Sequence, residues 1–133
     1  MNFSKISLIM LLAVFFVSCS NGQTETGESK TLLSATEFSQ KISEMPDATV
    51  VDVRTPDEYF GGHLTESLNY DWNGANFDKQ VATLKKSEPV FVYCRSGGRS
   101  ASAVRRMKSL GFTQVFELDG GIMAWDAAKL PME

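Results

Sequence analysis

Apolar residues along the chain fall into two alternating patterns, short runs and helical periods. The short runs predict strands at residues 31–33, 50–53, 90–93 and 115–118, with a further short one near 68–70. Apolar positions spaced three or four apart predict helices at 38–45 and 77–84 and a helix that starts near Ser100 and ends near 110, and a last helix is expected at 121–128. Strands alternating with helices predict an α/β fold: an open, mostly parallel sheet of about five strands with helices on both faces.

Two helix starts are marked by a capping box, in which a hydroxyl residue is followed three positions later by glutamate. Ser34 and Glu37 form the first such pair, and Thr55 and Glu58 form the second. Pro56 occupies the first helical position of the second, where its fixed φ and missing N–H are tolerated. Both positions follow a predicted strand, which supports the strand–helix alternation.

The first 18 residues are predicted to be a signal peptide and not part of the fold. Lys5 precedes an apolar run at 6–17, which is shorter than the roughly 20 residues of a membrane span. The following residues 16–19, Phe-Val-Ser-Cys, resemble the lipobox of bacterial lipoproteins, although Phe16 stands where leucine is preferred. The resemblance implies that Cys19 carries a lipid and becomes the new N-terminus. An ordinary signal peptide or a retained anchor are the alternatives.

The chain is thus expected to have three parts: a signal peptide (1–18), a lipidated cysteine with a flexible polar tether (19–30), and one domain (31–133). We expect a monomer in the bacterial cell envelope, held to a membrane by its lipid and facing the periplasm or the exterior. A net charge of −3 argues against a nucleic-acid partner. A single histidine and two distant cysteines offer no metal site, and no cofactor is expected.

The candidate chemistry lies in the loop between the strand at 90–93 and the next helix. Its residues are Cys94, Arg95, Ser96, Gly97, Gly98, Arg99 and Ser100. A glycine-containing loop before a helix N-terminus can direct its backbone N–H groups at an anion. The same field, with two arginines beside it, lowers the pKa of a cysteine and favours the nucleophilic thiolate. The plain alternative is an inert cysteine buried at the end of a core strand.

This loop resembles the active-site loop of the rhodanese family of sulfurtransferases. Residues 51–59 and 62–64 resemble the early motif of that family, and residues 118–125 with 130–131 resemble its closing motif. The resemblance covers nearly everything from about Thr31 to Pro131, as a single copy of the unit. It departs at 65–67, where Thr-Glu-Ser replaces the usual proline-glycine-alanine type of turn.

The resemblance implies a two-step sulfur transfer through a persulfide on Cys94. Arg95 and Arg99 would hold a small anionic sulfur donor, and the N–H groups of residues 96–100 would stabilise the persulfide. A thiol or cyanide would then accept the sulfur. Because the mercaptopyruvate branch has a smaller, uncharged residue after the cysteine, Arg95 favours thiosulfate as the donor.

Other functions of the same loop remain open. Cysteine phosphatases and arsenate reductases use a similar cradle, but their Cys-x5-Arg loop is one residue longer than the four residues between Cys94 and Arg99. Catalytically silent rhodanese-like binding modules usually lose the cysteine, so Cys94 argues against a binding module, although a persulfide carrier serving one partner would look identical in sequence. Three further motif residues, Asp52, Arg54 and His63, are interpreted as structural, and Trp125 as part of the core.

Overall fold

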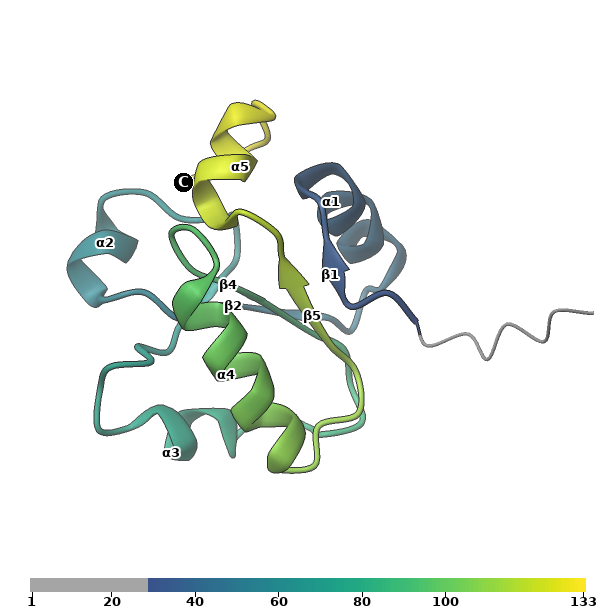
Figure 1. Cartoon of the computed structure of the whole chain (residues 1–133), viewed down its shortest axis with the longest axis vertical. Coiled ribbons are helices and arrows are strands. Elements are labelled where there is room, and N and C mark those ends of the chain that lie inside the picture. Colours follow the sequence, from purple (N-terminus) through teal and green to yellow (C-terminus); the bar gives the residue numbers. More distant parts are fainter. Residues whose placement is uncertain (1–28) are drawn as a thin grey trace, which may run out of the picture.

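The computed structural model of the protein describes residues 29–133, which fold around one sheet (Figure 1). Its strands are β1 (Leu32–Leu33), β2 (Thr49–Asp52), β3 (Leu68–Asn69), β4 (Val90–Tyr93) and β5 (Val115–Leu118). Its helices are α1 (Ala35–Glu44), α2 (Pro56–Phe60), α3 (Phe77–Val81), α4 (Gly98–Ser109) and α5 (Gly121–Ala127). The predicted signal peptide and the lipidated Cys19 lie outside the described residues.

All strands of this sheet are parallel, in the order β1-β5-β4-β2-β3. The prediction of an α/β fold with a parallel sheet is confirmed. Strand β4 lies at the centre, where Val90–Tyr93 pair with Thr49–Asp52 of β2 on one side. On the other side Val90 and Phe91 pair with Val115 and Phe116 of β5. The loop after β4 therefore emerges from the middle of the carboxyl edge, where parallel α/β sheets bind ligands.

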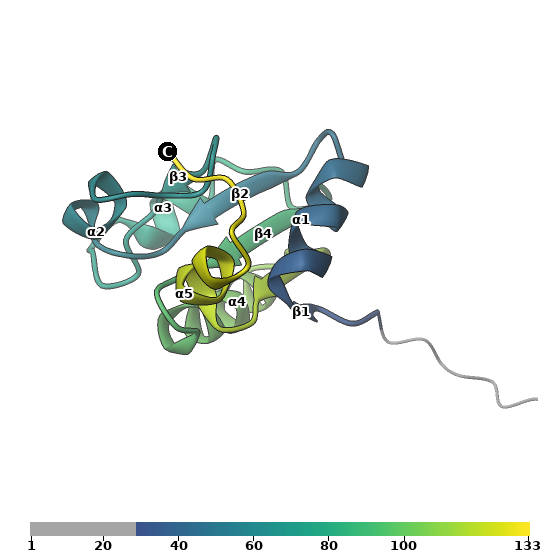
Figure 2. The same ribbon diagram turned by 90° about the horizontal axis from the view of Figure 1, so that it is seen from above.

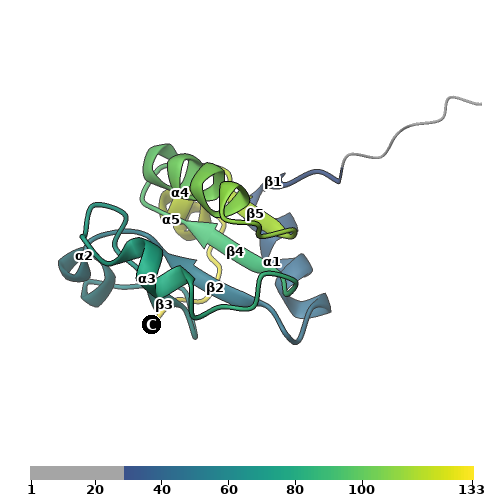
Figure 3. The same cartoon turned by 90° about the horizontal axis from the view of Figure 1, so that it is seen from below.

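Helices cover both faces of the sheet, and the side chains of β4 alternate between the two layers. Val90 and Val92 join the core under α3 and α4, whereas Phe91 and Tyr93 join the core under α1 and α5. Figure 3 shows α3 and α4 from below, beside β4 and β2. Figure 2 shows α1 and α2 at opposite ends of the molecule. Because β4 is covered on both sides, its four residues are all buried.

The core under α1 and α5 is built on aromatic contacts. The Phe38 ring meets the Phe91 ring edge to face at 5.1 Å and the Trp125 ring at 6.1 Å. Trp125 donates its indole N–H to the carbonyl of Pro131 at 2.9 Å, so its one polar atom is paired. The interpretation of Trp125 as a core residue is confirmed.

Both capping boxes are present, at Ser34 with Glu37 and at Thr55 with Glu58. Two helices differ in length from the prediction. Helix α3 stops at Val81, because the amides of Thr83 and Leu84 bond three residues back, to the carbonyls of Gln80 and Val81. Helix α4 begins two residues earlier than Ser100, because the preceding glycine turns the chain directly into the helix. Within residues 29–133, no helix is both long and apolar enough to cross a membrane.

Candidate functional site

Cys94 directly follows β4, and its side chain is 1% exposed. The backbone N–H of Gly97 donates to the Cys94 sulfur at 3.1 Å, and the Ser100 hydroxyl lies 3.4 Å from the same atom. Ser100 is itself fully buried in the first turn of α4. The loop thus curves around one sulfur atom, which contacts the Gly97 N–H and the Ser100 hydroxyl near the N-terminus of the 12-residue helix α4.

Two opposing effects set the pKa of the Cys94 thiol. Burial alone would raise it, because a thiolate loses hydration. The hydrogen bonds outweigh burial, so the pKa is lowered from its ordinary value. The donors are the Ser100 hydroxyl and the backbone N–H groups of Ser100, Gly97 and Ser96. The thiolate is therefore stabilised by the loop itself.

The loop reaches this shape through a left-handed residue at its centre. Gly97 has φ of +118°, a conformation that residues with a Cβ rarely adopt, and it is the residue that caps α4. A Cβ added to Gly97 or Gly98 would meet no other atom within 4 Å. The mouth of the loop is therefore open to a ligand on the side of these two residues.

The two arginines of the loop have different surroundings. Arg99 donates from both terminal nitrogens to the carboxylate of Glu58, at 2.6 and 2.8 Å. Arg95 is exposed, and it forms no ion pair with any residue in the range 29–133. Most of the charge of Arg99 is thus engaged within the protein, whereas that of Arg95 faces solvent.

The pair of Arg99 and Glu58 joins α2 to the active-site loop. Its hydrogen bonds lower the pKa of Glu58 to about 2, and they raise that of Arg99. The other Glu58 contacts are to the backbone and hydroxyl of Thr55, in the capping box. A bidentate, partly buried pair of this kind holds both side chains in one geometry. Sequence reasoning identified Glu58 only as a capping residue, because its partner lies 41 positions away.

The N-terminus of α5 is fastened to the same loop. The N–H of Ile122 donates to the carbonyl of Cys94 at 2.9 Å, and the N–H of Met123 donates to that of Arg95 at 3.2 Å. This approach requires glycine at 121, which has φ of +59° and where a Cβ would lie 2.5 Å from three backbone atoms of residues 94 and 95. The Gly120-Gly121 pair of the closing motif was the one sequence signal of this contact.

The remaining motif residues have internal partners. Arg54 forms a buried ion pair with Asp52 at 2.6 Å and donates to the carbonyl of Gly62 at 2.7 Å. The His63 ring stacks on the Tyr59 ring at 3.8 Å, and its Nδ1 lies 3.0 Å from the Tyr59 carbonyl oxygen. These contacts brace the loop at 60–64, and they agree with a structural role for all three motif residues.

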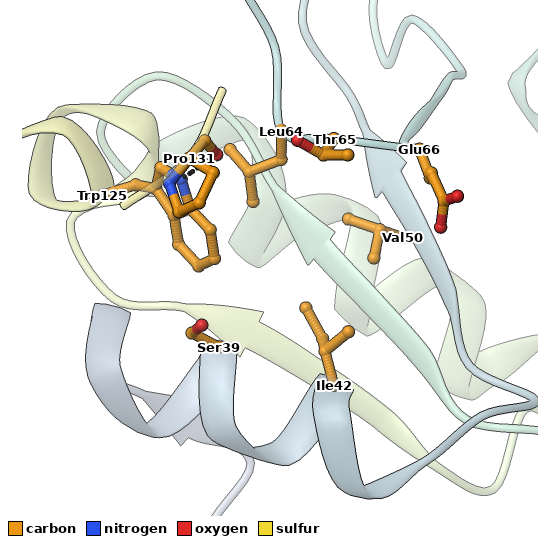
Figure 4. Close-up of a pocket in the computed structure, with 8 residues that line it drawn as sticks. All are labelled: Ser39, Ile42, Val50, Leu64, Thr65, Glu66, Trp125 and Pro131. Atoms are coloured by element: carbon orange, nitrogen blue, oxygen red, sulfur yellow. Dashed lines mark hydrogen bonds between the residues drawn. The ribbon is translucent and has the colours of Figure 1, made fainter. Parts of the chain in front are cut away.

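Two hollows of similar size lie in different places. The first, of about 230 Å³, is shown in Figure 4. Its lining includes Ile42, Leu64 and Trp125, which belong to the core under α1 and α5, whereas Cys94 belongs to the other core. A second cleft of about 250 Å³ borders the loop, and its lining residues are Arg54, Glu58, Gly61, Gly62, Ile122, Met123, Asp126 and Met132. The second is the cleft next to the candidate site.

Comparison with known proteins agrees with this geometry. The family model described as a rhodanese-like domain matches residues 34–128. The chain belongs to the rhodanese-like family. A sulfurtransferase of Allochromatium vinosum is 33% identical over 95 residues, covering 71% of this chain and 87% of that protein. The thiosulfate sulfurtransferase GlpE of Pseudomonas fluorescens is 35% identical over 89 residues, covering 67% of this chain and 79% of that protein.

Solved structures support the same assignment. A rhodanese-related protein from Thermoplasma volcanium superimposes with a TM-score of 0.68 at 27% identity, covering 77% of this chain and 96% of that one. Some other curated relatives are longer, and the matched segment covers only 50% and 51% of two of them. The rhodanese-like domain is thus shared by proteins of different length, several of which are named sulfurtransferases.

The predicted loop residues lie together in the structure, from Cys94 to Ser100 at the carboxyl edge of the sheet. Two acidic residues that contact them were missed, Glu58 of α2 and Glu117 of β5. Among residues 29–133, no three His, Cys, Asp or Glu side chains are placed to bind a metal ion.

We predict that Gly121→Ala destabilises the fold by more than about 3 kcal/mol, because the new Cβ collides with backbone and φ is left-handed. Gly98→Ala is the matched control: it changes the same residue type at the start of α4, where no atom lies within 4 Å. We expect the control to be neutral or to gain up to about 1 kcal/mol. Urea unfolding of both variants measures the difference, and equal stabilities would contradict the close approach.

Proposed function

We propose that the protein is a thiosulfate sulfurtransferase in which Cys94 carries the sulfur. The observation that carries this proposal is the buried Cys94 sulfur in a ring of donors that lowers its pKa. The Cys94 thiolate attacks the outer sulfur of thiosulfate, a sulfur–sulfur bond forms at Cys94, and sulfite leaves with the electron pair of the broken bond. The N–H groups of residues 96–100 then stabilise the terminal sulfur of the persulfide.

Arg95 is assigned to the anionic donor. It is the loop arginine that faces solvent, whereas Arg99 is held by Glu58. We therefore assign Arg99 chiefly to holding the loop against α2, and Arg95 to attracting the dianion. The choice of thiosulfate also draws support from relatives that are named thiosulfate sulfurtransferases.

In the second step a thiolate or cyanide takes the outer sulfur of the persulfide and returns Cys94 to its thiolate. We assign the acceptor to the cleft lined by Ile122, Met123 and Met132, which adjoins the loop because the amides of Ile122 and Met123 bind the carbonyls of Cys94 and Arg95. The scheme is ping-pong, because the donor leaves before the acceptor reacts.

A phosphatase or arsenate reductase is less well supported by the geometry. Such an enzyme needs its loop arginine for the oxyanion, and here Arg99 donates from both terminal nitrogens to Glu58. A carrier or binding module that serves one partner does not need an open donor site, whereas the loop is open at Gly97 and Gly98. The sulfurtransferase accounts for both features.

We predict that Cys94→Ala abolishes thiocyanate release from thiosulfate and cyanide, to below about one part in 10³ of the wild-type rate, because no other group of the loop can form a persulfide. Ser109→Ala, at the far end of α4, is the control and should keep full activity. Circular dichroism must show both variants folded. Sulfur transfer by a folded Cys94→Ala variant would refute the nucleophile.

We predict that Arg95→Ala raises the KM for thiosulfate about tenfold or more, because a charge-assisted hydrogen bond contributes about 1.5–3 kcal/mol. Discharge of the preformed persulfide to cyanide should change less than threefold, which a single-turnover experiment measures. Two variants serve as controls: Arg95→Lys keeps the charge at this position, and Lys79→Ala removes one charge from α3, away from the loop. Equal losses in both half-reactions would assign Arg95 to the shape of the loop.

We also propose that the protein is a lipoprotein of the bacterial cell envelope, on the strength of the resemblance of residues 16–19 to a lipobox. A thioether-linked lipid would remove the Cys19 thiol, so that it cannot form a disulfide with Cys94. We predict that mass spectrometry of the protein from its native membrane finds a lipid-modified Cys19 at the N-terminus and a Cys94 that is alkylated without reductant. A disulfide between the two cysteines, or an unprocessed Met1, would contradict this.

A further inference from the structure

The Ser100 hydroxyl has one proton and three neighbours that can accept it. The Glu117 carboxylate oxygen Oε1 is at 2.7 Å, the carbonyl of Gly97 at 3.1 Å, and the Cys94 sulfur at 3.4 Å. Ser100 is fully buried, so water cannot donate a hydrogen bond to a neighbour that does not receive the hydroxyl proton. The shortest contact is to Glu117, a half-buried carboxylate on β5 that the mechanism above does not use.

The charge on Glu117 decides which neighbour receives this proton. When Glu117 is ionised, Ser100 donates to it, and the hydroxyl oxygen can only accept a hydrogen bond from the Cys94 thiol. When Glu117 is protonated, it donates to the Ser100 oxygen, and the hydroxyl proton is free to turn toward a Cys94 thiolate. The carboxylate and the thiolate therefore compete for a single donor.

We propose that Glu117 is a positioning residue that controls the ionisation of Cys94 through the Ser100 hydroxyl. The inference rests on the proposed function, in which the Cys94 thiolate is the nucleophile. The S–H bond of Cys94 breaks and its proton binds the Ser100 oxygen, while Ser100 gives its own proton to Glu117. The electron pair stays on the sulfur, and no further reactant is needed.

The surroundings of Glu117 allow it to take that proton. Its strand neighbours are Leu32 of β1 and Val92 of β4, which bring no charge. Burial, the largest effect, raises the pKa of the Glu117 carboxyl, and Asp119 raises it further. The Ser100 hydrogen bond and the positive charges of Arg105 and Lys108 on α4 act in the opposite direction. The net direction is upward, so the carboxyl lies closer to neutrality than an exposed one.

The arrangement limits the charge of the buried cluster. With the proton on Glu117, the cluster carries one negative charge, on the sulfur, and not two. A dianionic donor approaching the loop then meets less repulsion than it would beside an ionised Glu117 and a thiolate together. Cys94 and Glu117 are thus expected to titrate as a coupled pair.

Glu117→Gln in the full chain tests the coupling. The glutamine amide can donate to the Ser100 oxygen without an ionised carboxylate, so Ser100 stays available to the thiolate. We expect the pKa of Cys94 to fall by at least about one unit, which is about a tenfold higher alkylation rate at pH values well below it. The readout is the rate of reaction with iodoacetamide against pH, with the Cys94 peptide quantified by mass spectrometry so that Cys19 does not contribute.

Two further variants separate the hydroxyl relay from a simple field effect. Asp119→Asn removes a charge from the same end of β5 and should change the pKa of Cys94 by no more than about 0.3 units. Ser100→Ala should raise the pKa of Cys94. In the Ser100→Ala background, Glu117→Gln should shift the Cys94 pKa by less than half as much as it does in the wild type. A Glu117→Gln shift no larger than that of Asp119→Asn, or an equal shift with and without Ser100, would overturn the proposal.

The alkylation readout does not depend on sulfur transfer. If thiocyanate release fails in the wild type while the Glu117→Gln shift appears, the proposed function fails and the coupling stands. If sulfur transfer depends on Cys94 but the shift is missing, the function stands and the coupling fails. Thermal unfolding of each variant verifies that the titrated protein is folded.

Discussion

The site depends on the close approach of the N-terminus of α5 to the backbone of the active-site loop. The amides of Ile122 and Met123 bind the carbonyls of Cys94 and Arg95, so these carbonyls are held toward α5. The N–H of Ser96 shares a trans peptide unit with the Arg95 carbonyl and points the opposite way, and it is one of the donors to the Cys94 sulfur. Glycine at 121 is what allows this distance, because a Cβ there would overlap the loop backbone. Helix α5 therefore shapes the loop that surrounds the sulfur.

Charge in the loop is divided between structure and ligand. The bidentate contact of Arg99 with Glu58 satisfies the fork of the guanidinium and links α2 to the start of α4. Arg95 lies on the exposed side, and in a chain of net charge −3 it provides a local positive field. A loop whose two arginines both faced the donor would lose its link to α2. The division explains how a short loop can be rigid and still attract an anion.

Most of the fold could be predicted from the sequence, because the patterns that indicate its helices and strands are local. The capping boxes at Ser34 and Thr55 and the apolar runs of the strands each act within a few residues, and the structure confirms them. The loop after β4 was predicted for the same reason, since its residues are contiguous. The roles of Glu58, Glu117 and Gly121 were not predicted, because their partners lie 17 to 41 positions away or are backbone atoms of another segment. Only the sheet order brings them together.

A thiolate that needs no imidazole beside it is a consequence of this geometry. The one imidazole of the chain is that of His63. Its ring stacks on the Tyr59 ring, and its Nδ1 lies within hydrogen-bonding distance of the Tyr59 carbonyl oxygen, so these contacts are with α2 and not with Cys94. Stabilisation comes instead from amides, a hydroxyl and a helix N-terminus, none of which needs to change its protonation state. The backbone amides are fixed before the reaction starts, and they remain in place for a persulfide whose outer sulfur carries the charge. The same ring can therefore serve both halves of a sulfur transfer.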